Sequence, residues 1–425
     1  MRRYAESQLE GPRMRVIHFN TYASGGSAVL MQRLHRALRE RGHDSAMRYA
    51  AGELAETHAQ RRYADEGGLD ALRTRVRHSL ENRMLRASPP SYFSRSRSHR
   101  DTTLEAMDRD ADLYHLHWVG RWLDLPSFVA SIPAETPIVW TIHDMSPLAG
   151  GCFTDFGCEQ LGNECRRCPL LRAPFDRWVA RQEWQRRDEA LRGRNLHIVA
   201  NSRFTANLVE KSPLMDRPRT LTIIPPGLDT TALTAMDTLA AKRALGIDEN
   251  ALVIGFGAAS VTDENKGCDR FLAVVKALGK RVERVVALTF GDGLPPEFDG
   301  VNVKHMGALG NPEELSIAYS AMDALVVTSR METFGQVAIE AQSCGTPAWG
   351  FRVGGLPDAI RPGETGGLVA FGETEQMAEE IAEAHRAGQL LTLGEAGMAW
   401  VREKFKMAAI AEQYEAVYQS AISPP

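Results

Sequence analysis

The sequence is short of three features. It has only six cysteines in 425 residues, which excludes a disulfide scaffold and suits a reducing compartment. It has no run of about 18 apolar residues, so no transmembrane helix is predicted. Its first 205 residues contain no lysine. Residues 1–6 carry charge with no apolar core behind them, so we expect no signal peptide. Residues 1–13 are expected to be a flexible extension, and the protein to be cytoplasmic.

The net charge conceals two parts of opposite sign. The chain has 50 basic and 54 acidic residues, and its formal charge of −4 gives no reason to expect nucleic-acid binding. Residues 1–205 hold 31 arginines against 25 acidic residues, a surplus of +6, which leaves −10 for the remainder. A basic first part suits an anionic acceptor or a membrane surface. The acidic second part must bind any anion through local features.

Short apolar runs alternate with stretches of helical period, which is typical of βαβ units and parallel sheets. Strands are predicted at 15–19, 113–117, 137–143, 197–201, 252–258, 285–290, 302–305, 324–328, 348–351 and 368–370. A helix is predicted over 27–41. The predicted fold class is α/β, with two doubly wound Rossmann-like domains facing a cleft. Ligands of such sheets bind beyond the C-terminal strand ends.

A strand that ends in a Pro/Gly turn near residues 223–227 marks the connection between the domains. We assign residues 14–205 to the first domain, with a Cys-rich insertion at 150–170. Residues 206–400 form the second domain. Residues 401–425 are predicted to be a helix that crosses back to the first domain.

Two glutamates follow the apolar run at 324–328. Glu332 should lie on a loop at the cleft, and a helix should begin near Phe334. The free N–H groups of that helix would form an anion site. Glu340 lies on the helix in an apolar setting, where a carboxylate needs a partner such as a ligand hydroxyl. The alternative is two ordinary solvated glutamates.

The Glu332-x7-Glu340 spacing is followed by Gly-Thr-Pro at 345–347 and Val-Gly-Gly-Leu-Pro-Asp at 353–358. This arrangement resembles family 4 of the retaining nucleotide-sugar glycosyltransferases, which share the two-domain GT-B fold. The likeness is dense over 223–371 and weaker before it. The segment 115–168 is similar to bacterial glycosyltransferases of exopolysaccharide and colanic-acid-type pathways.

The resemblance implies a role for each matching residue. Glu332 would contact hydroxyls of the donor sugar, and Glu340 would bind the nucleotide ribose. The backbone N–H groups of Phe334 and Gly335 would hold the sugar and diphosphate. Backbone groups from Met306 onward would meet the nucleobase, which leaves the base unidentified. An ordinary strand-end turn is the alternative at Met306.

Lys266 follows the first strand of the second domain. A lysine there can neutralise a diphosphate leaving group, whose developing charge is the main electrostatic demand of the transfer. A solvated lysine before a helix is the alternative. The family usually has an arginine a few residues earlier, but residues 258–262 contain none. Arg330 is the candidate substitute.

Gly25 and Gly26 lie between the first strand and the first helix, where glycines let the backbone approach a phosphate. A tight connection with no ligand is the alternative. The resemblance places this loop at the donor phosphates or on the acceptor side. The dinucleotide fingerprint Gly-x-Gly-x-x-Gly is absent, which argues against a dehydrogenase.

His143 ends a predicted strand of the first domain and resembles the family's histidine at the sugar. The resemblance implies a hydrogen bond near the reacting centre, and a structural histidine is the alternative. His115 and His117 alternate along another strand. His117 with Trp118 would line an acceptor pocket, and a core histidine is an equal alternative.

Four of the cysteines, Cys152, Cys158, Cys165 and Cys168, are spaced as Cys-x5-Cys-x6-Cys-x2-Cys. Four thiolates at short spacing suit a tetrahedral structural zinc site, with no open position for catalysis. A disulfide or redox pair and free thiols are the alternatives.

Residues 72–86 carry apolar residues at every fourth position and arginines between them. Such a basic amphipathic helix can lie on an anionic membrane. The alternative is a helix with one buried stripe and a solvated basic face. Salt-sensitive binding to anionic vesicles separates the two interpretations.

The residues and the resemblance together predict a retaining glycosyltransferase that moves a sugar from a nucleoside diphosphate to an acceptor hydroxyl. The acceptor would be a sugar, a glycan or a lipid-linked glycan, and the enzyme would need no catalytic cofactor. A phosphorylase or sugar-phosphate synthase on the same fold is the rival enzyme. A non-catalytic sugar-nucleotide-binding module is the rival without activity.

Overall fold

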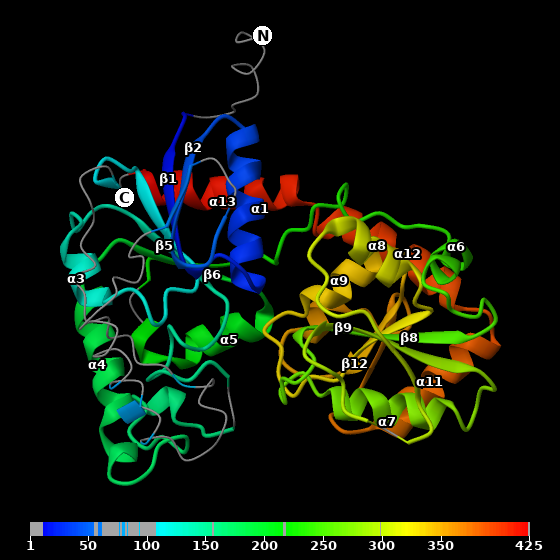
Figure 1. Cartoon of the computed structure of the whole chain (residues 1–425). Helices are drawn as coiled ribbons and strands as arrows, with labels where there is room; N and C mark the ends of the chain where they lie inside the picture. The colour runs from blue at the N-terminus through cyan, green and yellow to red at the C-terminus, as the bar shows by residue number, and fades with distance from the viewer. Residues whose placement is uncertain are drawn as a thin grey trace. The chain divides into compact units, whose positions relative to one another are not determined.

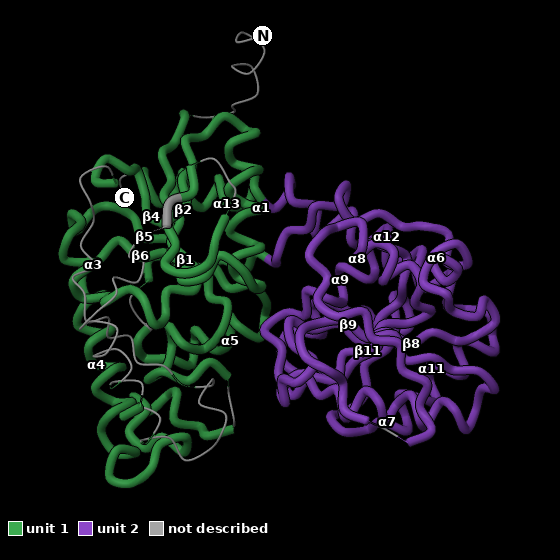
Figure 2. Tube along the Cα trace, in the orientation of Figure 1, with its two compact units in different colours: residues 1–224, 411–425 green, residues 225–410 purple. Residues whose placement is uncertain are grey.

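The computed structural model describes residues 12–54, 58–61, 76, 79–80, 83, 93, 108–154, 157–215, 218–297 and 299–423. The chain forms two compact units (Figures 1 and 2). Unit 1 comprises residues 1–224 and 411–425, and unit 2 comprises residues 225–410. Each unit is built on its own parallel sheet and has its own apolar core, as the α/β prediction requires.

Unit 1 contains a seven-stranded parallel sheet in the order β3-β2-β1-β4-β5-β6-β7. Its strands are β1 (Arg15–Tyr22), β2 (Asp44–Ala51), β3 (Ala59–Arg61), β4 (Leu113–Leu116), β5 (Ile138–Ile142), β6 (Leu196–Ala200) and β7 (Thr220–Ile223). β4, β5 and β6 are buried along their whole length, as expected where helices cover both faces of a sheet. The sequence predicts these three strands and β1, but not β2 and β3.

The helices of unit 1 begin with α1 (Gly26–Glu40), which matches the helix predicted over 27–41. The others are α3 (Leu125–Ala130), α4 (Val179–Leu191), α5 (Arg203–Lys211) and the 3₁₀ turns η3 (Leu161–Asn163), η4 (Phe175–Arg177) and η5 (Pro213–Met215). Ser202 caps α5, since its hydroxyl accepts a hydrogen bond from the Thr205 N–H at 3.1 Å.

Unit 2 contains a six-stranded parallel sheet in the order β10-β9-β8-β11-β12-β13. Its strands are β8 (Leu252–Ser260), β9 (Val285–Asp292), β10 (Asn302–His305), β11 (Ala324–Val327), β12 (Ala348–Phe351) and β13 (Gly366–Val369). Its helices are α6 (Thr238–Ala244), α7 (Cys268–Leu278), α8 (Pro312–Ser320), α9 (Gln336–Ser343), α10 (Leu356–Ala359), α11 (Thr374–Arg386) and α12 (Leu390–Lys404). All six strands are predicted by the sequence.

The last helix, α13 (Met407–Ile422), returns the chain to unit 1, as the sequence predicts. Tyr414 and Tyr418 are fully buried on it and hydrogen-bond with Thr141 of β5 and His115 of β4, at 3.0 and 2.7 Å. Glu415 pairs with the Arg41 guanidinium, with Nε 2.5 Å from Oε1. The helix therefore forms part of the core of unit 1.

The division between the units falls at Ile224 and Pro225 rather than at residues 205 and 206. Most of α5 and the strand β7 lie beyond residue 205, and β7 pairs with β6 at the edge of the first sheet. Backbone pairing thus carries unit 1 as far as the Pro/Gly turn. At the other end of unit 2, residues 401–410 remain with that unit.

Two predicted segments lie mostly outside the residues that the structure describes. The extension 1–13 lies outside the described residues except for its last two positions, and the basic helix over 72–86 does so except for four isolated positions. Within the described ranges, no helix combines the length and the apolar character needed to cross a membrane.

Candidate functional site

In unit 2 the strand order reverses between β8 and β11, which are direct neighbours. The chain that leaves β8 carries Lys266, and the chain that leaves β11 carries Glu332. Adjacent strand ends at such a reversal bring their following loops together. The Lys266 Nζ atom accordingly lies 2.6 Å from Glu332 Oε1, and the Ser329 hydroxyl donates to the same oxygen at 2.6 Å.

Lys266 and Glu332 keep hydrogen-bonding groups that a ligand could use. Burial lowers the pKa of Lys266, but the Glu332 carboxylate and Asp263 outweigh it, so the pKa lies above its ordinary value. Lys266 is therefore an ammonium group at neutral pH. Its other two N–H groups and the Oε2 atom of Glu332 have no hydrogen-bond partner in the part of the chain that the structure describes.

Two glycines fix the backbone beneath Glu332. The Gly355 N–H donates to the Glu332 carbonyl oxygen at 2.8 Å. A Cβ atom on Gly354, whose φ is +53°, would lie 1.9 Å from that carbonyl oxygen, and one on Gly355 would lie 2.1 Å from the Thr333 carbonyl oxygen. Only glycine permits so close an approach of the two loops. The Gly-Gly pair of the 353–358 motif therefore holds the Glu332 loop in place.

The helix after this loop, α9, begins at Gln336, slightly later than the predicted start at Phe334. Gly335 adopts a φ of +105° and precedes the helix, and no side chain caps it. The backbone N–H groups of Phe334 and Gly335 have no partner among the described residues. Unpaired N–H groups at a helix N-terminus attract anionic oxygens.

Glu340 on α9 is half-buried and accepts a hydrogen bond from the Tyr319 hydroxyl to Oε2 at 3.1 Å. Tyr319 itself is fully buried on α8. A carboxylate held by a buried tyrosine is not an ordinary solvated glutamate. Glu340 keeps a fixed position, as a residue that binds a ligand hydroxyl requires.

Two arginines lie near the Lys266 loop. Arg270 on α7 donates from Nε to the Thr328 carbonyl oxygen at 3.0 Å, and it anchors the strand end. Burial lowers the pKa of Arg270, and so does the neighbouring charge of Arg330. The Arg330 side chain is exposed, and its guanidinium has no partner within the described ranges. Arg330 is therefore available to an anion, whereas Arg270 is already engaged.

Met306 lies beyond β10 and packs against the core of unit 2. Its backbone N–H donates to the Thr289 carbonyl oxygen at 2.9 Å, and the Gly307 carbonyl oxygen accepts from the Gly291 N–H at 2.8 Å. The sheet therefore uses the N–H of Met306. Contacts with a nucleobase would fall to other backbone groups of this turn.

In unit 1 the strand order reverses between β1 and β4. Gly25 and Gly26 follow β1, and both are exposed at the start of α1. Gly25 adopts a φ of +92°, while a Cβ atom on it would meet nothing within 4 Å, so the backbone angle alone favours glycine there. No acidic side chain occupies the first turn of α1.

His143 follows β5 and is half-buried. Its Nε2 atom lies 3.1 Å from Nδ1 of His117, and burial lowers the pKa of His143 to about 3. Next to it, Asp144 accepts from the Trp118 indole N–H at 2.5 Å and from the Ser146 hydroxyl at 2.6 Å. The predicted histidine thus belongs to a polar cluster at the C-terminal strand ends of unit 1.

Two family models match most of the chain between them. The model described as "Glycosyltransferase Family 4" matches residues 24–232, and the model described as "Glycosyl transferases group 1" matches residues 251–386. The chain belongs to these glycosyltransferases. The first match covers most of unit 1 and ends at residue 232, just past the division at residue 224, and the second lies within unit 2.

Curated relatives match the chain over part of its length. The D-inositol 3-phosphate glycosyltransferase of Segniliparus rotundus is 32% identical over 238 residues, which are 53% of this chain and 52% of that protein. The N-acetyl-alpha-D-glucosaminyl L-malate synthase of Bacillus anthracis is 34% identical over 160 residues, which are 35% of this chain and 42% of that protein. The chain spans about half the length of the curated relatives that it matches.

Solved structures confirm the GT-B fold of the chain. The sucrose-phosphate synthase of Thermosynechococcus elongatus superposes with a TM-score of 0.66 and 18% identity, over 96% of this chain and 99% of that one. Anabaena HepE in complex with UDP-glucose superposes with a TM-score of 0.65 and 18% identity, over 96% and 100%. The two-domain Rossmann-like prediction is therefore confirmed.

The four cysteines at residues 152–168 lie in unit 1 after β5. Cys152, Cys165 and Cys168 are buried, Cys158 is half-buried, and all four are free thiols. Burial raises the pKa of Cys168 to about 11. The Gly150 N–H donates to Cys165 Sγ at 3.2 Å. Among the described residues, no three of the four sulfurs lie within 4.8 Å of one another, whereas ligand atoms of His18, His115 and His117 do.

Sequence reasoning missed several residues of these clusters. Ser329 and Arg270 are ordinary residues in the sequence, and only the strand order places them beside Lys266 and Glu332. His18 lies in a predicted strand with no motif around it. The pairing of His18 with His115 across β1 and β4 could have been found only from the register of the sheet.

Proposed function

We propose that the protein is a retaining glycosyltransferase that moves a sugar from a nucleoside diphosphate to an acceptor hydroxyl in polysaccharide or glycoconjugate synthesis. The observation that carries this proposal is the Lys266–Glu332 pair, with an N–O distance of 2.6 Å, at the strand reversal of unit 2. An ammonium group and a carboxylate with unused hydrogen-bonding capacity suit a ligand that combines phosphates with sugar hydroxyls.

The donor would bind mainly to unit 2. Lys266 and the exposed guanidinium of Arg330 would neutralise the diphosphate, and the N–H groups of Phe334 and Gly335 would donate to its oxygens. Glu332 would accept from sugar hydroxyls through Oε2. Glu340, fixed by the Tyr319 hydroxyl, would accept from the ribose. The solved complex of Anabaena HepE contains UDP-glucose, which supports a nucleotide-sugar donor here.

The reaction requires no protein nucleophile. The bond between the anomeric carbon and the phosphate oxygen breaks, and the diphosphate leaves with the bonding electrons. The acceptor hydroxyl then attacks the oxocarbenium-like carbon on the same face, and its proton passes to a phosphate oxygen. Catalysis would come from positioning and from stabilisation of the leaving diphosphate by Lys266 and the α9 N-terminus.

A phosphorylated acceptor is a second candidate, and a specific observation favours it. The Segniliparus rotundus relative is named for an inositol phosphate. The surplus of arginine in residues 1–205 would suit an acceptor with a phosphate group. In this case the protein would be a sugar-phosphate synthase on the same fold. Competition between neutral and phosphorylated acceptors in one assay distinguishes the two.

The donor can be found by measuring thermal unfolding with UDP-, GDP- and ADP-sugars. A ligand that binds only the native state raises the unfolding temperature, and a hundredfold excess over its dissociation constant stabilises by about 2.7 kcal/mol. Transfer or slow hydrolysis of the stabilising donor would distinguish the enzyme from a non-catalytic binding module. EDTA is expected to leave the rate unchanged, because no divalent cation enters the proposed step.

Substitution then tests the site. Lys266→Ala and Glu332→Ala are each expected to lower kcat by about 100- to 1,000-fold, since each removes a group aimed at the transition state. Glu264→Ala is the matched control, because Glu264 is exposed in the same loop. Wild-type turnover in both site variants, with folding intact, would refute the proposed function.

A further inference from the structure

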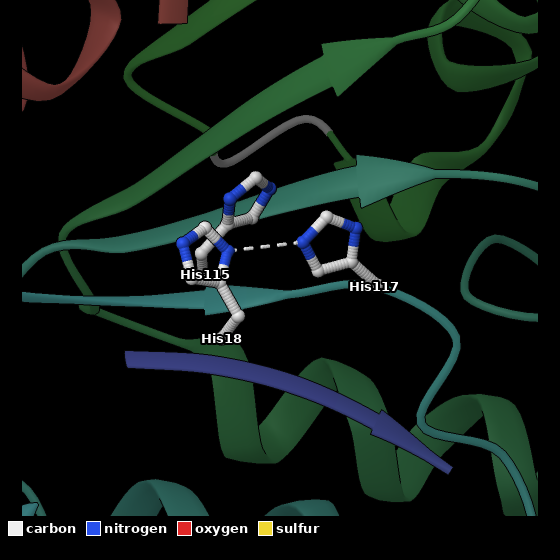
Figure 3. Close-up of side chains that lie close together, drawn as sticks. All are labelled: His18, His115 and His117. Carbon is white, nitrogen blue, oxygen red and sulfur yellow. Dashed lines mark hydrogen bonds between the residues drawn. The ribbon is translucent and has the colours of Figure 1, made fainter. Parts of the chain in front are cut away.

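Three histidines of unit 1 form a chain of hydrogen bonds. His143 Nε2 lies 3.1 Å from His117 Nδ1, and His117 Nε2 lies 3.2 Å from His18 Nδ1. Figure 3 shows the rings of His18 and His117 turned toward each other. His18 comes from β1, His117 follows β4 and His143 follows β5. The chain therefore runs across three neighbouring strands, from the core to the strand ends.

All three rings are neutral at physiological pH. Burial holds the pKa of His18 and of His117 well below the ordinary value, with smaller contributions from neighbouring histidines, and it lowers that of His143 to about 3. A neutral imidazole has one N–H donor and one acceptor nitrogen. Each link of the chain therefore has one donor and one acceptor, and all links must point the same way.

His18, at the buried end of the three histidines, decides which way the hydrogen bonds point. His18 Nε2 is buried and has no hydrogen-bond partner. A buried N–H without an acceptor is rarer in proteins than an unused acceptor, so the His18 proton belongs on Nδ1. His18 then donates to His117 Nε2, which places the His117 proton on Nδ1. His117 in turn donates to His143 Nε2, which leaves the His143 proton on Nδ1.

We propose that His18 and His117 are positioning residues that hold His143 as the Nδ1–H tautomer, so that it presents a hydrogen-bond donor to the substrates. The His143 Nδ1 atom has no partner among the described residues, and the side chain is half-buried. The ligand atom that it would meet is an acceptor, such as a phosphate oxygen or the oxygen of a sugar hydroxyl.

This proposal rests on the proposed function and narrows it. His143 could not remove the proton of the acceptor hydroxyl, because its lone pair on Nε2 is already used by His117. The proton of the reaction would therefore go to the phosphate oxygen and not to this histidine. His143 would instead stabilise negative charge or orient the sugar by donating a hydrogen bond.

A metal ion is the competing explanation of the cluster. Ligand atoms of His18, His115 and His117 lie within 4.8 Å of one another (Figure 3). Both nitrogens of His115, however, already hydrogen-bond, with the Tyr418 hydroxyl at 2.7 Å and the Thr141 hydroxyl at 2.8 Å. Three neutral ligands would also leave a buried divalent charge without a counter-charge, which is costly. The hydrogen bonds explain the cluster better.

The tautomer can be measured directly. In protein with ¹⁵N-labelled histidine, the nitrogen shifts and two-bond couplings separate a protonated from a bare ring nitrogen. His143 is expected to carry its proton on Nδ1 in the wild-type protein, and His143→Gln assigns the signals. A proton on His143 Nε2 in the wild-type protein would overturn the proposal, whatever the variants do.

Variants test the positioning. His117→Leu removes the donor that fixes the tautomer, so His143 is expected to populate both tautomers instead of Nδ1–H alone, and kcat is expected to fall by up to about 10-fold, the worth of one hydrogen bond. His117→Asn keeps an N–H near the position of Nδ1 and is expected to restore the wild-type tautomer. His115→Gln is the matched control on the same strand, because His115 takes no part in the hydrogen bonds that link His18, His117 and His143. A change of the His143 tautomer in His115→Gln as large as the change in His117→Leu would contradict the assignment.

The failures of the two proposals can be told apart. If no donor sugar is transferred but His143 carries its proton on Nδ1, the proposed function fails and the positioning stands. If transfer occurs but His143 carries its proton on Nε2, the positioning fails alone. A near-stoichiometric metal in purified protein that is lost in His18→Leu would also overturn the positioning, since a metal cannot share the nitrogens of the chain.

Discussion

The buried histidines of unit 1 should make its stability depend strongly on pH. His18, His115 and His117 are at most 1% exposed, and burial holds the pKa of each well below the ordinary value of about 6.5. Below about pH 6.5 these histidines bind protons in the unfolded chain, but they stay neutral in the folded unit. Stability is therefore complete above pH 7 and is lost as the pH falls through the unfolded pKa.

The magnitude follows from linkage. Lowering the pH from 7.5 to 5.5 costs about 1.4 kcal/mol for each histidine that stays neutral in the folded unit, or about 4 kcal/mol for the three. A domain of this size has a total stability of about 5–15 kcal/mol. Unit 1 should therefore approach spontaneous unfolding near pH 5, before most carboxylates titrate.

The assay is urea unfolding at pH 7.5, 6.5 and 5.5, followed by tryptophan fluorescence. Five of the seven tryptophans lie in residues 1–224, so Trp349→Phe with Trp400→Phe restricts the signal to unit 1. His115→Gln should reduce the loss by about 1.4 kcal/mol. His58→Gln, at an exposed position, should not change it. Equal unfolding free energies at pH 7.5 and 5.5 would refute the reasoning.

Two further predictions concern the glycine pair and the cysteines. Gly354→Ala places a Cβ atom 1.9 Å from the Glu332 carbonyl oxygen and should displace the Glu332 loop, with a loss of about 1–3 kcal/mol in stability and a fall in kcat at least as large as that of Glu332→Ala. Gly310→Ala, where a Cβ atom meets nothing within 4 Å, is the control, and wild-type kcat in Gly354→Ala would contradict the account. If zinc draws the thiolates of Cys152, Cys158, Cys165 and Cys168 closer together than they lie in this structure, purified protein is expected to contain about one zinc per chain. Metal-free protein whose cysteine-to-serine variants fold normally would rule out zinc.

The strands of both sheets were predictable wherever burial on both faces produced a continuous apolar run. β2 was not, because Asp44, Ser45 and Arg48 interrupt its pattern, and its pairing with β1 is a long-range effect. Tertiary context overrides local propensity at such positions. The same holds for the boundary at residue 224, which depends on the pairing of β7 with β6.

The candidate site was predictable residue by residue but not as an arrangement. Lys266 and Glu332 could each be proposed from the motif that surrounds them, yet they are 66 positions apart and nothing local indicates that they pair. The strand order of the sheet brings them together. The hydrogen bonds among the histidines could not be predicted for a related reason. Neutral buried histidines have no sequence signature, and His18 contacts His117 only across neighbouring strands.

The return of α13 to the first unit has a consequence for biosynthesis. Tyr414, Glu415 and Tyr418 supply partners for groups in the core of unit 1, yet they are synthesised only after the whole of unit 2. Domains generally fold as the chain emerges, the N-terminal one first. Here the unit that begins first is completed last, so a nascent chain exposes an unfinished core while unit 2 folds, and expression of residues 1–224 alone would preserve that vulnerable state.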